Sequence, residues 1–158
     1  MNEQEQAGFM KRLGRAWNEI MGEAEKQRIR RIWRGAQEGT LTDQEELRLA
    51  KILKDHTEFH QYWSEPVHRS QPLRDQDINP FLHVSLHLII ENQIAQGRPS
   101  RAEQLYNREI ERGIPRHKVI HHLAGVFSEV LYDTLRRRKP FDQARYLARL
   151  QEETSQIG

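Results

Sequence analysis

Six of the eight histidines in this chain form three pairs with the spacing His-x-x-x-His. The pairs are His56 and His60, His83 and His87, and His117 and His121. Residues at positions i and i+4 of a helix lie one turn apart on the same face, so both imidazoles of a pair point the same way. Two imidazoles on one helical turn can bind a single metal ion. The spacing therefore indicates metal chemistry, provided that the helices meet.

A metal site is predicted where these helices converge. Helical bundles hold zinc or iron between helices that contribute histidines and carboxylates. We expect a mononuclear site for a divalent metal, zinc or iron. The expected ligands are His60, His83, His87 and His121, and the further candidates are His56, Glu91 and Glu129. An open position on this metal would activate a water molecule, with Glu91 or Glu129 as the base.

The sequence favours a structural role for the buried histidine cluster, and metal binding is the competing interpretation. Buried neutral imidazoles can tie one helix to another by hydrogen bonds, without any metal. A metal would require neutral rings, so its binding should weaken as the pH falls through about 6.5. The sequence offers no phosphate-binding glycine loop and no Gly-x-Ser-x-Gly motif. It therefore leaves open whether the protein is an enzyme.

The composition of the chain limits which metal ligands and nucleophiles it can supply and where the protein is expected to reside. The chain has 158 residues, no cysteine and a formal net charge of +2. Thiolate metal ligands, cysteine nucleophiles and disulfides are therefore excluded. The N-terminus is acidic and lacks the apolar core of a signal peptide, and no apolar run reaches the roughly 20 residues that a membrane-spanning helix needs. We expect a cytoplasmic protein with no membrane span.

The element that positions the central histidine pair is the apolar run 79–94. Asn79 can accept from the first free amides of a helix, and Pro80 occupies a position that tolerates proline. Gly97 and Pro99 end the helix at the other side. Apolar residues surround the run, so it is predicted to be a core helix that carries His83 and His87.

The remaining elements are also predicted to be helices. Residues 5–24 and 25–39 form one long bent helix or two. Capping boxes at Thr42–Glu45 and Ser100–Glu103 begin two more, the first running to about residue 62. A helix over 115–138, a last helix capped by Asp142 and a loop over 64–78 complete the chain. The prediction is an all-α, single-domain bundle of about five to seven helices, with an N-terminal helical segment 1–40, a histidine-containing bundle 41–152 and a tail 153–158.

An interaction module is the rival functional class. The amphipathic N-terminal helix could bind a protein partner, although packing against its own bundle is the simpler account. Basic side chains could also contact nucleic acid. They are Arg28, Arg30, Arg31 and Arg34, and Arg136, Arg137, Arg138 and Lys139. Cations at the end of a helix are favoured by its dipole, and the chain lacks a domain-wide basic stripe, so nucleic-acid binding is not expected.

Several segments together resemble a known bacterial family. They are His56-Thr57-Glu58-Phe59-His60, Asn79-Pro80-Phe81-Leu82-His83 with His87 and Gln93, His121 with Glu129, and 142–150 with Tyr146-Leu147. From about residue 33 to 150 the chain resembles the domain-of-unknown-function family eighteen forty-one. The resemblance implies a helical fold and supplies no activity. The chain departs from the family pattern at Ile120 and Gly125, where acidic residues are expected, so a site that used those carboxylates would lack them here.

Overall fold

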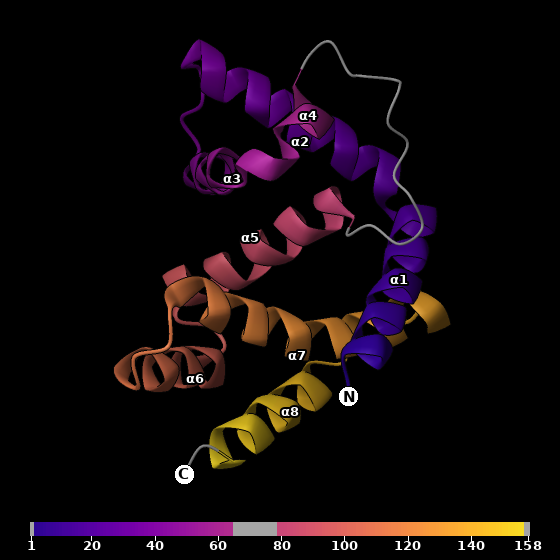
Figure 1. Ribbon diagram of the computed structural model, residues 1–158, viewed down its shortest axis with the longest axis vertical. Helices are drawn as coiled ribbons and strands as arrows, with labels where there is room; N and C mark the ends of the chain where they lie inside the picture. Colours follow the sequence, from indigo (N-terminus) through magenta and orange to yellow (C-terminus); the bar gives the residue numbers. More distant parts are fainter. Residues whose placement is uncertain (1, 65–78, 157–158) are drawn as a thin grey trace. The chain divides into compact units, whose positions relative to one another are not determined.

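The computed structural model describes residues 2–64 and 79–156 (Figure 1). The described residues contain eight α-helices, one short 3-10 helix and no strand. The all-α prediction is confirmed, but the predicted number of five to seven helices is wrong. The eighth helix arises because the segment 42–62, which was expected to form one helix, is divided into two α-helices and a short 3-10 helix. The expected loop 64–78 lies, apart from residue 64, outside the described residues.

The contacts of the chain fall into two compact units, Met1–Leu88 and Ile89–Gly158. We call them the N-terminal unit and the C-terminal unit and describe each by itself. The predicted segments 1–40, 41–152 and 153–158 stay predictions. No helix within the described residues is long and apolar enough to cross a membrane.

The N-terminal unit begins with two helices, α1 (Glu3–Ile20) and α2 (Gly22–Glu38), which a break at Met21 separates. The sequence had left one long helix or two as alternatives. The helix α2 ends at Gly39, whose φ of 70° lies in the left-handed region that favours glycine. Trp17 of α1 and Ile32 of α2 are buried, so both helices pack on the core.

The next helix, α3 (Gln44–Asp55), is shorter than the sequence predicted. It is followed by the 3-10 helix η1 (Thr57–Phe59) and by α4 (His60–Trp63). Its N-cap is Asp43, whose carboxylate accepts from the Glu46 amide at 3.0 Å, so the predicted Thr42 cap is wrong. An acceptor one residue later in the chain takes the same role.

Two histidine rings bond to the last carbonyls of α3, which ends at Asp55. His56 Nδ1 lies 2.7 Å from the Ile52 carbonyl oxygen. His60 Nε2 lies 2.9 Å from the Leu53 oxygen and 3.1 Å from the Lys54 oxygen. In a continuing helix these carbonyls would accept from backbone amides further along the chain. The His60 ring takes the place of those amides at Leu53 and Lys54, whereas the Ile52 oxygen also accepts from the His56 amide at 3.2 Å. The prediction of one helix to residue 62 is therefore wrong.

The helix α5 (Pro80–Gln96) begins and ends as predicted. The Asn79 side-chain oxygen accepts from the amides of Phe81 at 3.1 Å and Leu82 at 3.2 Å. Gly97 follows with a φ of 65°. Apolar side chains on several sides of α5 are buried, which confirms a core helix. Its residues to Leu88 belong to the N-terminal unit and those from Ile89 to the C-terminal unit.

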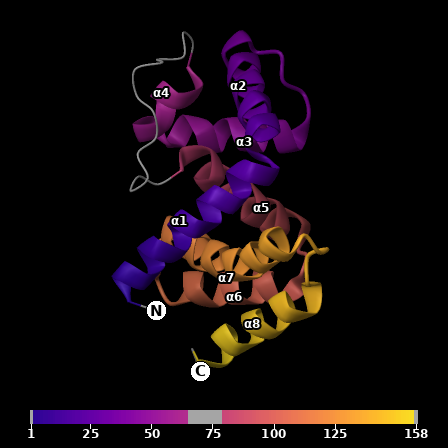
Figure 2. The same ribbon diagram turned by 90° about the vertical axis from the view of Figure 1, so that its right-hand side faces the viewer.

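The C-terminal unit also contains α6 (Ser100–Glu111), α7 (Arg116–Arg137) and α8 (Gln143–Gln156), which pack on one another (Figure 2). Asp142 caps α8 by accepting from the Arg145 amide at 3.0 Å, as predicted. The predicted Ser100 cap is wrong, because Pro99 is the N-cap of α6 and no side chain caps it. The core of the unit includes Leu105, Leu123, Tyr146 and Leu150, all fully buried.

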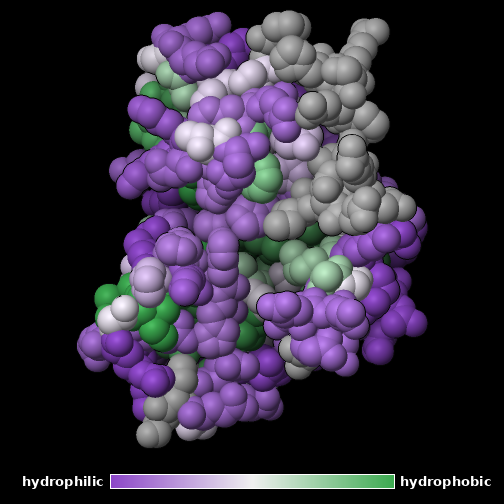
Figure 3. Space-filling model, viewed as in Figure 1, coloured by the Kyte–Doolittle hydropathy of each residue, from purple (hydrophilic) through white to green (hydrophobic). Residues whose placement is uncertain are grey.

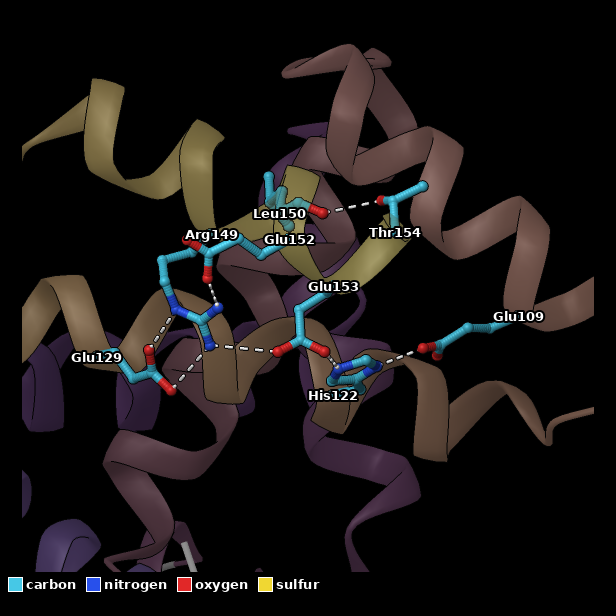
Figure 4. A network of polar contacts seen from close by, with 8 residues as sticks. All are labelled: Glu109, His122, Glu129, Arg149, Leu150, Glu152, Glu153 and Thr154. Carbon is cyan, nitrogen blue, oxygen red and sulfur yellow. Dashed lines mark hydrogen bonds and ion pairs between the residues drawn. The ribbon is translucent and has the colours of Figure 1, made fainter. Parts of the chain in front are cut away.

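Charged side chains join the three long helices of the C-terminal unit (Figure 4). The two ring nitrogens of His122 on α7 face carboxylates on different helices, Glu109 of α6 and Glu153 of α8. Arg149 of α8 donates to Glu129 of α7 and to Glu153. These hydrogen bonds raise the pKa of the Arg149 guanidinium above its usual range, the bond to Glu129 most of all. We call the group the carboxylate–His122 network.

A buried tyrosine adds a second polar link within the same unit. The Tyr146 hydroxyl donates to the Gln93 side-chain oxygen at 2.7 Å, which ties α8 to α5. Burial raises the pKa of Tyr146 above its usual range, since the ionised form would lose its hydration. The residue therefore acts as a neutral hydrogen-bond donor in the core.

Candidate metal centre

Three histidines of the N-terminal unit bring ring nitrogens together: His56, His83 and His87. His83 and His87 lie one turn apart on α5, as the spacing predicts. His56 occupies the junction between α3 and η1, with φ −94° and ψ 66°. We call these three residues the histidine triad. Within the described residues it is the group of at least three histidine or carboxylate side chains whose ligand atoms converge closely enough for a metal ion.

The three rings form a nearly equilateral triangle. The ring centroids are 4.7 Å apart for His83 and His87, 4.7 Å for His56 and His87, and 5.1 Å for His56 and His83. One ligand nitrogen from each ring lies within 4.8 Å of the other two. Nitrogens bound at 2.0–2.1 Å to one tetrahedral zinc are roughly 3.4 Å apart. A closure of up to roughly 1.4 Å would therefore bring the triad to zinc geometry.

The protonation of His56 is suited to metal binding. Its Nδ1 faces the Ile52 carbonyl oxygen, which can only accept, so Nδ1 carries a proton and donates. In the neutral form of this ring, Nε2 carries the lone pair that can bind a metal. Histidines that bind metals commonly donate their other ring N–H to a carbonyl or carboxylate, which fixes the tautomer and the ring orientation. The bond from Nδ1 to the Ile52 carbonyl thus prepares His56 to bind a metal through Nε2.

The surroundings of the triad are largely apolar and aromatic. His87 is only 7% exposed, and His56 and His83 are half-buried. The Phe59 ring stacks on His56 with an interplanar angle of 3° and a centroid distance of 6.0 Å. It also meets the edge of His83 at 5.7 Å. An apolar neighbour such as Phe59 limits the access of water to a metal bound beside it.

The other predicted histidine ligands have different places. His60 donates through Nε2 to the last carbonyls of α3, so this nitrogen is not available to a metal. The His60 ring centroid lies 4.7 Å from that of Trp33. His121 lies on α7 in the C-terminal unit and is exposed, as is His117. The structure therefore brings together three of the seven named candidates, and His56 had been only a further candidate.

The predicted carboxylates are engaged by arginines. Glu91 accepts from Arg116 at 2.6 and 2.7 Å, and this bidentate pair raises the pKa of Arg116 above its usual range. Glu129 accepts from Arg149 at 2.9 Å. Guanidinium groups thus take the oxygens that were candidates for metal binding or for a catalytic base. Both ion pairs lie within the C-terminal unit.

The basic side chains that could have met nucleic acid are partly neutralised. On α2, Arg28 contacts Glu45 at 2.9 Å, and Arg31 lies 3.9 Å from Glu46. Arg30 donates to the Tyr62 carbonyl and covers the Phe81 ring at 5.4 Å. The basic residues 136–139 at the end of α7 are exposed. Hydrophilic residues cover most of the described surface on the face shown in Figure 3.

Comparisons with known proteins bear on the family and not on the site. No curated protein and no solved structure matches the chain. The model of one protein family matches residues 23–152, which is most of the chain and extends somewhat beyond the resemblance seen from residue 33 to 150. The family is described only as a domain of unknown function, so the match assigns no chemistry. On this match, the chain belongs to the family Domain of unknown function (DUF1841).

Proposed function

We propose that the protein binds one divalent transition-metal ion through His56, His83 and His87. The observation that carries the proposal is the convergence of three ring nitrogens within 4.8 Å of one another. The Nδ1 bond of His56 and the aromatic shell around the rings support it, because both are common features of histidine metal sites. The proposal does not use His60 or His121.

Zinc fits this set of ligands better than iron. Three imidazoles without a carboxylate resemble the three-histidine zinc sites that keep a fourth position for water. Non-haem iron sites commonly combine two histidines with one carboxylate. The carboxylates once considered for this role, Glu91 and Glu129, are paired with arginines. We therefore expect zinc to be preferred, with a water molecule as the fourth ligand.

Equilibrium dialysis against zinc tests the proposal. Protein made without a histidine tag should bind one zinc ion per chain. Zinc at 100 times its dissociation constant should also raise the free energy of unfolding of the N-terminal unit by about 2.7 kcal/mol, because the ion binds the folded state. Unfolding followed by tryptophan fluorescence reports this unit, since all three tryptophans lie in it. Less than a stoichiometric amount of zinc with no change in stability would refute the proposal.

A purely structural role is the competing account. It draws on the same ring contacts and on the bonds by which His56 and His60 end α3. In that account the three rings are neutral packing partners, and zinc would bind no better than to an exposed histidine pair. The pair His117 and His121 on α7 provides that comparison.

A further inference from the structure

The segment Thr57–Trp63, which follows His56, depends on tertiary contacts for its position. It consists of η1 with three residues and α4 with four. Helices this short are not stable by themselves, because the first turn fixes several residues for a single hydrogen bond. Side-chain contacts must therefore place the segment. Several of these contacts are made to the histidine triad.

Phe59 connects the triad to the rest of this segment. Its ring contacts His56 and His83 on one side. It also meets Trp63 at 6.2 Å, in an edge-on arrangement. Trp63 is 1% exposed and contacts the Phe81 ring of α5 at 6.0 Å. A continuous row of rings thus runs from the triad through Phe59 into the core of the N-terminal unit.

Metal binding would change the positions of the rings that Phe59 touches. The ligand nitrogens lie up to 4.8 Å apart, and zinc would draw them to roughly 3.4 Å. His56 is the residue immediately before η1 and has non-helical dihedral angles, so a shift of its ring acts directly at the start of the segment. Packed interiors transmit such shifts, because they contain few voids.

We propose that the metal centre is a sensor whose bound ion fixes the segment Thr57–Trp63, with Phe59 as the positioning residue that couples the two. This inference rests on the proposed zinc binding. Opening of the segment removes the Phe59 ring from its contacts with His56 and His83, so the open form binds zinc less well. Zinc therefore selects the closed form, and the fraction of closed segment reports the concentration of the metal.

Amide hydrogen exchange with and without zinc tests this coupling. If opening of the segment breaks the site, zinc at 100 times its dissociation constant should slow exchange of the amides of Thr57–Trp63 about 100-fold. Amides of α8 in the C-terminal unit should change less than about twofold, since the ion is not bound there. Slowing of the segment by less than about threefold, although zinc binds, would overturn the inference and leave the proposed function standing. Failure of zinc to bind at all would overturn both.

A Phe59→Leu variant tests the role of the ring. Zinc at 100 times the variant's own dissociation constant should slow exchange of Thr57–Trp63 less than about tenfold, because leucine lacks the ring that links the triad to the segment. Phe127→Leu, at a half-buried phenylalanine of the C-terminal unit, is the matched control and should keep the full effect. Full slowing in Phe59→Leu would overturn the role of Phe59. If that variant fails to fold, the comparison on the unchanged protein still decides whether zinc and the segment are coupled.

Discussion

Replacing His83 and His87 together by alanine is expected to abolish specific zinc binding. The change removes two of the three converging imidazoles and leaves His56 alone. Structural zinc sites with four ligands bind with about 10–16 kcal/mol, or roughly 3 kcal/mol for each ligand. The dissociation constant should therefore rise by at least about a thousandfold, which corresponds to about 4 kcal/mol. Competition with a chromophoric chelator measures the change.

The matched control is the double variant His117→Ala with His121→Ala. This variant removes a histidine pair of the same spacing from an exposed face of α7. The dissociation constant for zinc should change less than about twofold. Equal weakening in both double variants would mean that zinc binds any histidine pair on a helix. An unchanged affinity in the His83 and His87 variant would locate the metal elsewhere.

Replacing His122 by alanine is expected to destabilise the C-terminal unit by about 3 kcal/mol. Glu109 is 3% exposed and faces His122, and the variant leaves its carboxylate buried without this partner. Glu153 loses its contact with the same ring, at 3.0 Å. Removing the hydrogen-bond partner of a buried carboxylate costs more than the bond contributes, because the remaining group stays desolvated. Native-state hydrogen exchange of the most protected amides of α7 measures the free energy of opening.

Two further variants identify the cause of that loss. His117→Ala on the same helix is exposed and should change the free energy by less than about 0.5 kcal/mol. Adding Glu109→Gln to His122→Ala should recover part of the stability, since the buried charge is then removed. Equal effects of His117→Ala and His122→Ala, or no recovery in the double variant, would mean that the carboxylate–His122 network does not hold the helices together.

Local chemistry explains what the sequence predicted well. The start of α5 depends on Asn79 and Pro80 and its end on Gly97, all of which act on neighbouring backbone groups. The pair His83 and His87 shares a face because four residues make about one helical turn. These features follow from residues close in the chain, so a single sequence reveals them.

Side chains that bond to distant or unexpected partners explain what the sequence missed. Periodicity predicts that α3 continues through His56 and His60, because it cannot show that the His60 ring bonds to the carbonyls of Leu53 and Lys54. Because α3 ends at Asp55, the His60 ring bonds to the end of α3, and His56 lies beside His83 and His87 of α5. Arg116 pairs with Glu91, 25 residues away in the chain, and Arg149 pairs with Glu129, 20 residues away. A local sequence pattern cannot reveal pairs at such separations.

The carboxylate–His122 network was also missed, although a signal for it exists. Ala102, Leu105 and Glu109 follow helical spacing, and all three are buried on α6. A carboxylate on an apolar stripe requires a charged or donating partner. His122 lies outside the three His-x-x-x-His pairs, so their spacing does not indicate it. The sequence therefore indicated that Glu109 needed a partner, but not which residue it was.

X-ray absorption spectroscopy of the zinc-loaded protein tests the central claim most directly, because it reports the atoms bound to the metal. The structure predicts three imidazole nitrogens and one further light-atom ligand, at about 2.0–2.1 Å. The His83→Ala and His87→Ala double variant, loaded with the same amount of zinc, should show at most one imidazole. A spectrum of the unchanged protein with only oxygen ligands, or with a single imidazole, would contradict the assignment of His56, His83 and His87 as the metal centre.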